Sequence, residues 1–119
     1  MSKRILVIDD EPLILDLLTI LLSNFGYQVD RASSAQEALR QIDTQDAIFV
    51  DIRMPGMDGK EFYERVKACF PPMARRVIFV TGDLACPQTI SFIRRTGNLY
   101  LEKPFTLKEV RALLEVFSK

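Results

Sequence analysis

Five polar side chains follow apolar runs of the kind that form buried strands, and together they have the chemistry of phosphoryl transfer. They are Asp9, Asp10, Asp51, Thr81 and Lys103. If the fold brings the three carboxylates together, each pair at ~4 Å repels by roughly 4 kcal/mol at an effective dielectric of ~20, so the group needs protons or a cation. Oxygen ligands without His or Cys suit Mg²⁺, or Mn²⁺. A hydroxyl and an ammonium suit a phosphoryl group, so the set predicts phosphoryl transfer to a carboxylate.

Strand-like and helix-like segments alternate along the whole chain. Strands are predicted at residues 5–8, 27–31, 47–50, 77–80 and 99–101. Helices are predicted at 12–24, from a capping box at 34–37 to residue 42, at 59–69, at 87–95, and after a second capping box at 106–109. Such alternation predicts an α/β fold with a parallel sheet, right-handed crossovers and helices on both faces. We expect a doubly wound, flavodoxin-like (βα)5 sheet with strand order 2-1-3-4-5.

This topology places the carboxyl ends of all strands at one edge of the sheet. The ends of the first and third strands are then neighbours, so Asp9 and Asp10 should lie beside Asp51, with Thr81 and Lys103 next to them. Taken singly, each of these residues has an ordinary explanation as a helix cap, a turn residue or a surface charge. Their common position at one edge favours a functional site.

Composition limits the class of protein. The 119 residues suit one domain, residues 1–119, and sixteen basic and sixteen acidic residues cancel. Nothing therefore predicts direct binding of nucleic acid or a membrane surface. The absence of histidine excludes a Ser-His-Asp site and a phosphohistidine on this chain, and two widely spaced cysteines, Cys69 and Cys86, suit a reducing compartment. The most apolar run, residues 13–22, is too short to span a bilayer, so we expect a cytoplasmic domain.

Four motifs then make the chemistry specific. I-D-D-E at 8–11, D-I-R-M-P-G-M-D-G at 51–59, V-T-G at 80–82 and K-P-F at 103–105 resemble, in order and spacing, the receiver domain of two-component response regulators. The resemblance covers essentially the whole chain. It implies that Asp51 accepts a phosphoryl group from a phosphohistidine on a sensor histidine kinase or a histidine-phosphotransfer protein. It also implies that the chain is an enzyme only in a limited sense, because it would catalyse just its own phosphorylation and the slow hydrolysis of its own phosphoryl group.

The same resemblance implies roles for the neighbouring residues. Asp10 and Asp51 would bind Mg²⁺ directly, Asp9 would help through water or a secondary contact, and Arg53 would offer its backbone carbonyl. Thr81 and Lys103 would hold the phosphoryl oxygens.

Signal output is expected away from the phosphorylation site. The resemblance implies that a cis peptide before Pro104 aims Lys103, and that Tyr100 changes rotamer when Thr81 moves. The interaction surface would then lie around Tyr100 and the fourth and fifth predicted helices, on a monomer or a weak phosphorylation-dependent dimer.

Three features are particular to this sequence. The short segment T-G-N-L-Y-L-E-K-P-F and V-T-G-D-L are similar to receivers at the C-terminus of hybrid sensor histidine kinases. Arg53 and Asp83 each follow a site residue by two positions, so we expect them to pair across the mouth of the site and slow hydrolysis. The first helix is apolar nearly all round, and we expect Leu15 and Leu18 or Leu22 to be exposed as a dock for the helices of the phosphodonor.

Three other functions share parts of this pattern. A haloacid-dehalogenase-type phosphatase also uses an Asp nucleophile, but it has a second acid two residues later, where this chain has Arg53. A flavodoxin-type FMN binder needs a phosphate loop rich in hydroxyls and amides after the first strand, where this chain has acids. A phosphorylation-independent docking module would not require the complete acceptor set.

Overall fold

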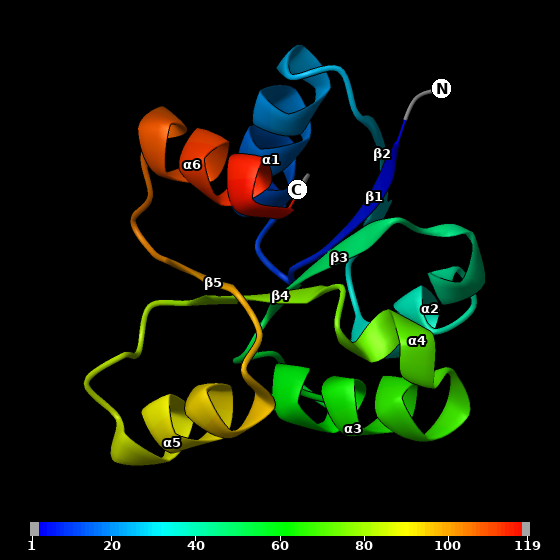
Figure 1. Cartoon of the computed structure of the whole chain (residues 1–119), viewed down its shortest axis with the longest axis vertical. Helices are drawn as coiled ribbons and strands as arrows, with labels where there is room; N and C mark the ends of the chain where they lie inside the picture. Colours follow the sequence, from blue (N-terminus) through cyan, green and yellow to red (C-terminus); the bar gives the residue numbers. More distant parts are fainter. Residues whose placement is uncertain (1–2, 118–119) are drawn as a thin grey trace.

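Five parallel strands form the sheet in the computed structural model, which describes residues 3–117 (Figure 1). They are β1 (Arg4–Ile8), β2 (Gln28–Ala32), β3 (Ala47–Asp51), β4 (Val77–Thr81) and β5 (Tyr100–Glu102). The strand order is β2-β1-β3-β4-β5, and every pairing is parallel. The predicted α/β fold and strand order are therefore confirmed. The expected domain limits, residues 1 and 119, lie outside the described residues.

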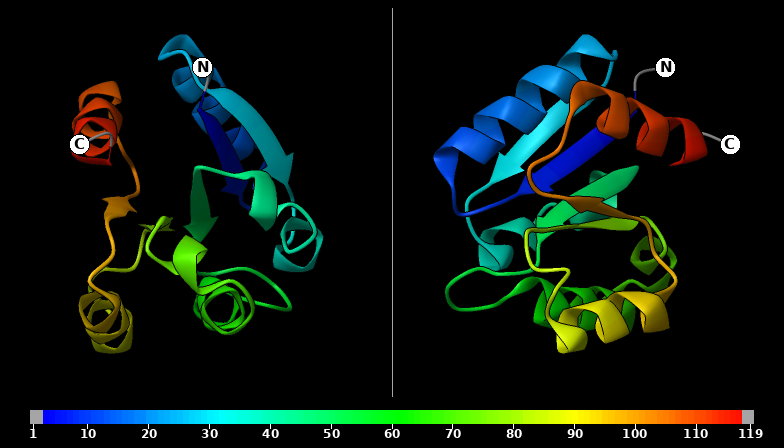
Figure 2. Two further views of the ribbon diagram at one scale, coloured as in Figure 1. Left: turned by 45° about the vertical axis from the view of Figure 1, so that its right-hand side comes forward. Right: turned by 90° about the vertical axis from the view of Figure 1, so that its left-hand side faces the viewer.

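Helices cover both faces of this sheet. They are α1 (Pro12–Asn24), α2 (Ala35–Ala38), α3 (Gly59–Cys69), α4 (Pro71–Ala74), α5 (Pro87–Thr96) and α6 (Leu107–Phe117), with one 3₁₀ turn, η1 (Ile42–Thr44). α1 and α6 lie on one face, and α2 to α5 lie on the other (Figures 1 and 2). None of the described helices combines the length and the apolar character needed to cross a membrane.

Alternation along each strand divides the apolar residues between two cores. On β1, Ile5 and Val7 face the core shared with α1 and α6, whereas Leu6 and Ile8 face the core shared with α2 to α5. Because both faces are buried, the central strands are continuously apolar from Ile5 to Ile8, from Ala47 to Val50 and from Val77 to Val80. On these three strands polar side chains therefore stand only at the ends.

The second predicted helix is much shorter in the structure. The Ser34 side chain accepts a hydrogen bond from the Glu37 N–H at 3.2 Å, as the capping box predicts, but α2 ends at Ala38. After that point the backbone hydrogen bonds span three residues and not four, as where the Gln41 N–H donates to the Ala38 carbonyl at 2.9 Å. Ile42 still reaches the core. The apolar pattern was therefore interpreted correctly, whereas the regular helix predicted to residue 42 was wrong.

The two adjacent prolines begin a short helix that the sequence analysis did not predict. Pro71 and Pro72 end α3, but proline suits the first turn of a helix because its missing N–H has no partner there. α4 follows directly and buries Met73 and Ala74.

The prediction that Leu15 and Leu18 or Leu22 are exposed on α1 is wrong. All three are buried in the core shared with α6, at helical spacings of three and four residues. The exposed apolar side chains of α1 lie on the opposite side of the helix: Leu13 at 82%, Leu17 at 42% and Ile20 at 58% of full exposure.

A close backbone approach positions the loop after β3. A Cβ atom on Gly59 would lie 2.7 Å from both the Asp51 carbonyl oxygen and the Ile52 Cα, so only glycine fits there. The Gly59 N–H donates to the Ile52 carbonyl at 2.9 Å, and Asp58 caps α3 by accepting from the Glu61 N–H at 2.9 Å. The start of α3 is thereby packed against the end of β3, next to Asp51.

Candidate functional site

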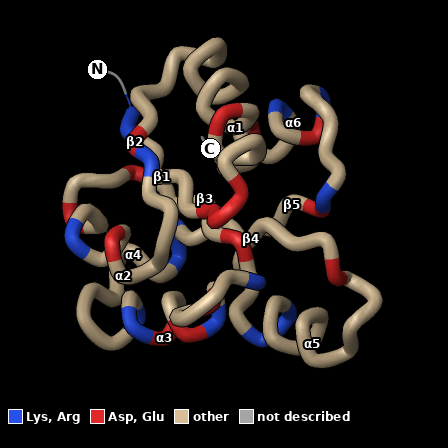
Figure 3. The backbone as a smooth tube through the Cα atoms, turned by 180° about the vertical axis from the view of Figure 1, so that it is seen from behind, with Lys and Arg blue, Asp and Glu red and all other residues tan. Residues whose placement is uncertain are grey.

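Acidic side chains converge where β1 and β3 end. Ile8 and Val50 are partners in the register, so the residues that follow them, Asp9 and Asp51, are neighbours. Carboxylate oxygens of four residues lie within 4.8 Å of one another: Asp9, Asp10, Glu11 and Asp51. Acidic segments of the chain gather at this place beside β3 and β4 (Figure 3). The three predicted carboxylates are therefore together.

The Lys103 ammonium lies among these acids. Its Nζ is 3.1 Å from Asp51 Oδ2 and 3.2 Å from Asp9 Oδ2, and both carboxylates are buried. A third contact joins Nζ to Glu11 Oε1 at 3.2 Å. The Lys103 N–H also donates to the Thr81 carbonyl at 2.8 Å, which extends the pairing of β4 with β5 and brings the lysine to the site.

Burial controls the ionisation of the two inner carboxyls. Burial, together with the charge of Asp9, raises the pKa of Asp51 from 3.8 to about 6, although Lys103 acts in the opposite direction. Burial also raises the pKa of Asp9. Burial would lower the pKa of Lys103, but the charges of Asp51 and Asp9 outweigh it and hold that pKa above its usual value. At neutral pH the Asp51 carboxyl, with a pKa of about 6, is therefore mostly ionised, and it shares the Lys103 ammonium with Asp9.

The residues present fit a hard divalent cation. Asp9 Oδ2 is buried and, although close to Lys103, accepts no hydrogen bond of good geometry within the described part of the chain. Asp51 Oδ1 is 3.3 Å from the Arg53 backbone nitrogen, which donates a long hydrogen bond. Acids whose oxygens are underused, with no His or Cys near them, match the ligands that Mg²⁺ takes in proteins.

Thr81 borders a cavity on the other side of Asp51. The cavity measures about 290 Å³ and is lined by Glu11, Asp51, Arg53, Thr81, Gly82, Asp83 and Lys103. The Thr81 hydroxyl accepts a hydrogen bond from the Asp83 N–H at 3.0 Å, which leaves its own proton available to donate. A buried carboxylate, a hydroxyl and an ammonium therefore line one space that is large enough to admit a phosphoryl group.

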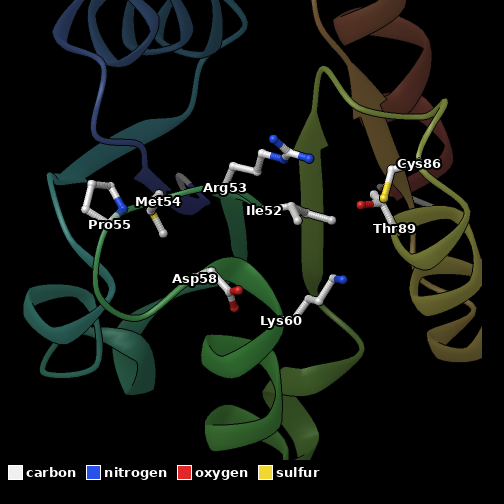
Figure 4. Close-up of a pocket in the computed structure, with 8 residues that line it drawn as sticks. All are labelled: Ile52, Arg53, Met54, Pro55, Asp58, Lys60, Cys86 and Thr89. Carbon is white, nitrogen blue, oxygen red and sulfur yellow. The ribbon is translucent and has the colours of Figure 1, made fainter.

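Arg53 and Asp83 form an ion pair beside that cavity, as predicted. Arg53 comes from the loop after β3, and Asp83 comes from the loop after β4, so the pair joins two loops at the mouth of the site. In Figure 4, Arg53 extends from its loop toward β4, above a second hollow of about 440 Å³ between α3 and α5. Asp58 and Lys60 lie on one side of that hollow, and Cys86 and Thr89 lie on the other.

The remaining predicted residues lie next to these groups along the chain. The Lys103–Pro104 peptide is cis. Tyr100 begins β5, and its side chain is exposed at 47%.

Sequence reasoning missed one residue of the site. Glu11 stands in the I-D-D-E motif at 8–11 without an assigned role, whereas its side chain reaches Lys103. Its position directly after two acids was the available signal, but the reach of a long side chain across the site is not visible in sequence.

Comparisons with known proteins agree with this geometry. The family model for the response regulator receiver domain matches residues 5–115. The alkaline phosphatase synthesis transcriptional regulatory protein PhoP of Bacillus subtilis is 33% identical over 117 residues, which cover 94% of this chain and 47% of that protein. The chain thus spans about half the length of this curated relative.

Solved structures show the same fold. The chemotaxis protein CheY4 of Vibrio cholerae has a TM-score of 0.87 at 25% identity, covering 98% of this chain and 99% of that one. The response regulator TrrA of Thermotoga maritima, solved in complex with Mg²⁺-BeF, has a TM-score of 0.84 at 30% identity, with coverage of 98% and 99%. With the family match over residues 5–115, these likenesses show that the chain belongs to the response regulator receiver family, the phospho-accepting domains of two-component signalling.

Proposed function

We propose that Asp51 is the phospho-acceptor of a receiver domain spanning residues 1–119, and that its donor is a phosphohistidine on a sensor histidine kinase or a histidine-phosphotransfer protein. The observation that carries this proposal is the buried Asp51 carboxylate, 3.1 Å from the Lys103 ammonium in a cavity that Thr81 also lines. The family match supports the receiver function over an Asp-nucleophile phosphatase.

Each group has a defined part in the transfer. An ionised Asp51 oxygen attacks phosphorus, the phosphorus–nitrogen bond to the donor imidazole breaks, and an acyl phosphate forms on Asp51. Because the pKa of Asp51 is about 6, its carboxylate is ionised and nucleophilic at pH 7. The Lys103 ammonium and the Thr81 hydroxyl bind the phosphoryl oxygens. The catalysis is thus limited to the domain's own phosphorylation and hydrolysis.

Mg²⁺ would be held by the acids of this site. Asp9, Asp10 and Asp51 supply carboxylate oxygens, Arg53 supplies its backbone carbonyl, and Mn²⁺ would suit the same ligands. When bound, the ion neutralises the acids and the incoming phosphoryl charge.

The signal would pass from the site along β4 and β5 to the surface of α5 and α6. In this proposal Thr81 moves toward the phosphoryl group, Tyr100 changes rotamer, and the surface of α5 and α6 changes. The partly exposed Tyr100 ring has room for that change. We further propose that this domain, a cytoplasmic monomer or weak phosphorylation-dependent dimer, contacts neither nucleic acid nor membrane directly, in line with its balanced charge. Origin from a hybrid kinase stays a prediction.

The first experiment tests whether Asp51 responds as an acceptor. Beryllofluoride, a mimic of the aspartyl phosphate, should shift amide resonances around Asp51 and Tyr100 only when Mg²⁺ is present. Asp51→Asn should abolish the response, and Asp43→Asn, at an exposed acid of η1 before the opposite end of β3, should retain it. An unresponsive wild-type chain would favour a phosphorylation-independent docking module.

The Arg53–Asp83 ion pair should lengthen the life of phospho-Asp51, because it restricts attacking water at the mouth of the cavity. Arg53→Ala and Asp83→Ala should each shorten the half-life about 2- to 5-fold, the effect expected of one exposed pair. Arg65→Ala breaks an exposed pair on α3 and should have no effect. Unchanged half-lives in both site variants would contradict this role.

The exposed stripe of α1 should contact the helices of the phosphodonor, because three aliphatic side chains are exposed to water on this helix, which begins directly after Glu11. Ile20→Glu and Leu13→Glu should lower the rate of transfer from a phosphorylated histidine-phosphotransfer domain about tenfold or more. Val116→Glu on α6, at the same 58% exposure as Ile20, is the matched control. Equal losses in all three variants would argue against a specific dock.

Removing the Asp51 charge should stabilise the metal-free fold. The folded pKa of about 6 exceeds the ordinary 3.8, so the unfolding free energy falls as pH rises from about 4 through 6. At pH 7 in the presence of a chelator, Asp51→Asn should raise the free energy of unfolding by about 1–3 kcal/mol. At pH 4.5 most of the gain should vanish, because Asp51 then holds a proton. Thermal unfolding at both pH values measures this, and a gain independent of pH would refute it.

A further inference from the structure

Lys103 has a third carboxylate partner whose environment differs from that of the other two. Glu11 Oε1 lies 3.2 Å from Nζ, as close as Asp9 Oδ2, but the Glu11 side chain is 61% exposed whereas those of Asp9 and Asp51 are buried. Burial fixes two of the partners in place. The third can leave for water at little cost.

The Glu11 backbone is fixed at the site even though its side chain is exposed. Its N–H donates to Asp9 Oδ1 at 2.9 Å, and Pro12 begins α1 directly after it. Glu11 occupies the N-cap position of α1, yet its carboxylate makes no capping hydrogen bond and turns back to Lys103 instead. The side chain therefore serves the site and not its own helix.

Glu11 stands where a phosphoryl group would need room. It lines the same cavity of about 290 Å³ as Asp51, Thr81 and Lys103. A phosphoryl group on Asp51 needs the Lys103 ammonium, and it carries negative charge into the cavity. The Glu11 carboxylate competes for the ammonium and repels that charge.

We propose that Glu11 is an exposed counter-anion that holds Lys103 in the unphosphorylated state and must release it when a phosphoryl group binds. Glu11 is thus a positioning residue that opposes phosphoryl binding through Lys103. This inference rests on the proposed role of Lys103 as a ligand of the phosphoryl group.

Calorimetric titration of the full chain with beryllofluoride at saturating Mg²⁺ tests the competition. Glu11→Gln should raise the affinity for beryllofluoride about 2- to 5-fold, the size expected of one partly exposed ion pair. The affinity for Mg²⁺ alone should fall by no more than about threefold, because Glu11 is an exposed member of the acid cluster whose direct ion pair is with Lys103. Glu61→Gln, which removes another exposed ion-paired acid, should change neither affinity.

A second variant separates the contact from the charge. Glu11→Asp keeps the charge but is one methylene shorter, so it should lose the contact with Lys103 and gain part of the affinity that Glu11→Gln gains. The proposal is overturned if Glu11→Asp stays at wild-type affinity while Glu11→Gln gains, if Glu11→Gln leaves beryllofluoride affinity unchanged, or if it weakens Mg²⁺ binding tenfold. A wild-type chain that does not bind beryllofluoride overturns the proposed function itself, and the inference with it.

Discussion

The site depends on the ion pairs that the Lys103 ammonium makes with Asp9 and Asp51. Two buried carboxylates at adjacent strand ends repel each other, and burial penalises both charges. One ammonium within 3.2 Å of both reduces that cost without removing it, since the pKa of Asp51 remains raised. One ammonium thus offsets only part of the repulsion and desolvation of the two carboxylates. A further cation would offset more of it, which is a physical reason for the acid cluster to prefer a divalent metal.

The sheet makes this arrangement possible. Parallel strands bring all carboxyl ends to one edge, and the bond from the Lys103 N–H to the Thr81 carbonyl places the lysine beside the ends of β1 and β3. At the other side of Asp51, the lack of a side chain on Gly59 lets α3 begin against the strand end. The position of Asp51 is therefore set by backbone geometry, and the polar side chains around it add charge at that position.

Much of this was predictable because the signals were local. Continuous apolar runs predicted the strands, and the polar residues that end them predicted the site edge; the pairing of Arg53 with Asp83 followed from their equal spacing after neighbouring strands. The failures at α1 and at Glu11 share one cause, which is that tertiary packing decides between local alternatives. Eight apolar residues on α1 leave only a narrow polar stripe, Asp16, Thr19 and Ser23, to indicate its rotation, and Leu15 was assigned to the wrong side. The reach of Glu11 to Lys103 likewise depends on packing.

The two edge strands limit how another protein can bind. β5 has only three residues, and β2 carries Asp30 and Arg31, whose side chains pair with Arg4 and Asp16. Short or charged edges resist the addition of a further strand, which protects the sheet against edge-to-edge aggregation. Recognition by strand addition is thereby disfavoured at both sides of the sheet. Partners must therefore bind to helices and loops, by packing against helices and not by adding a strand to the sheet.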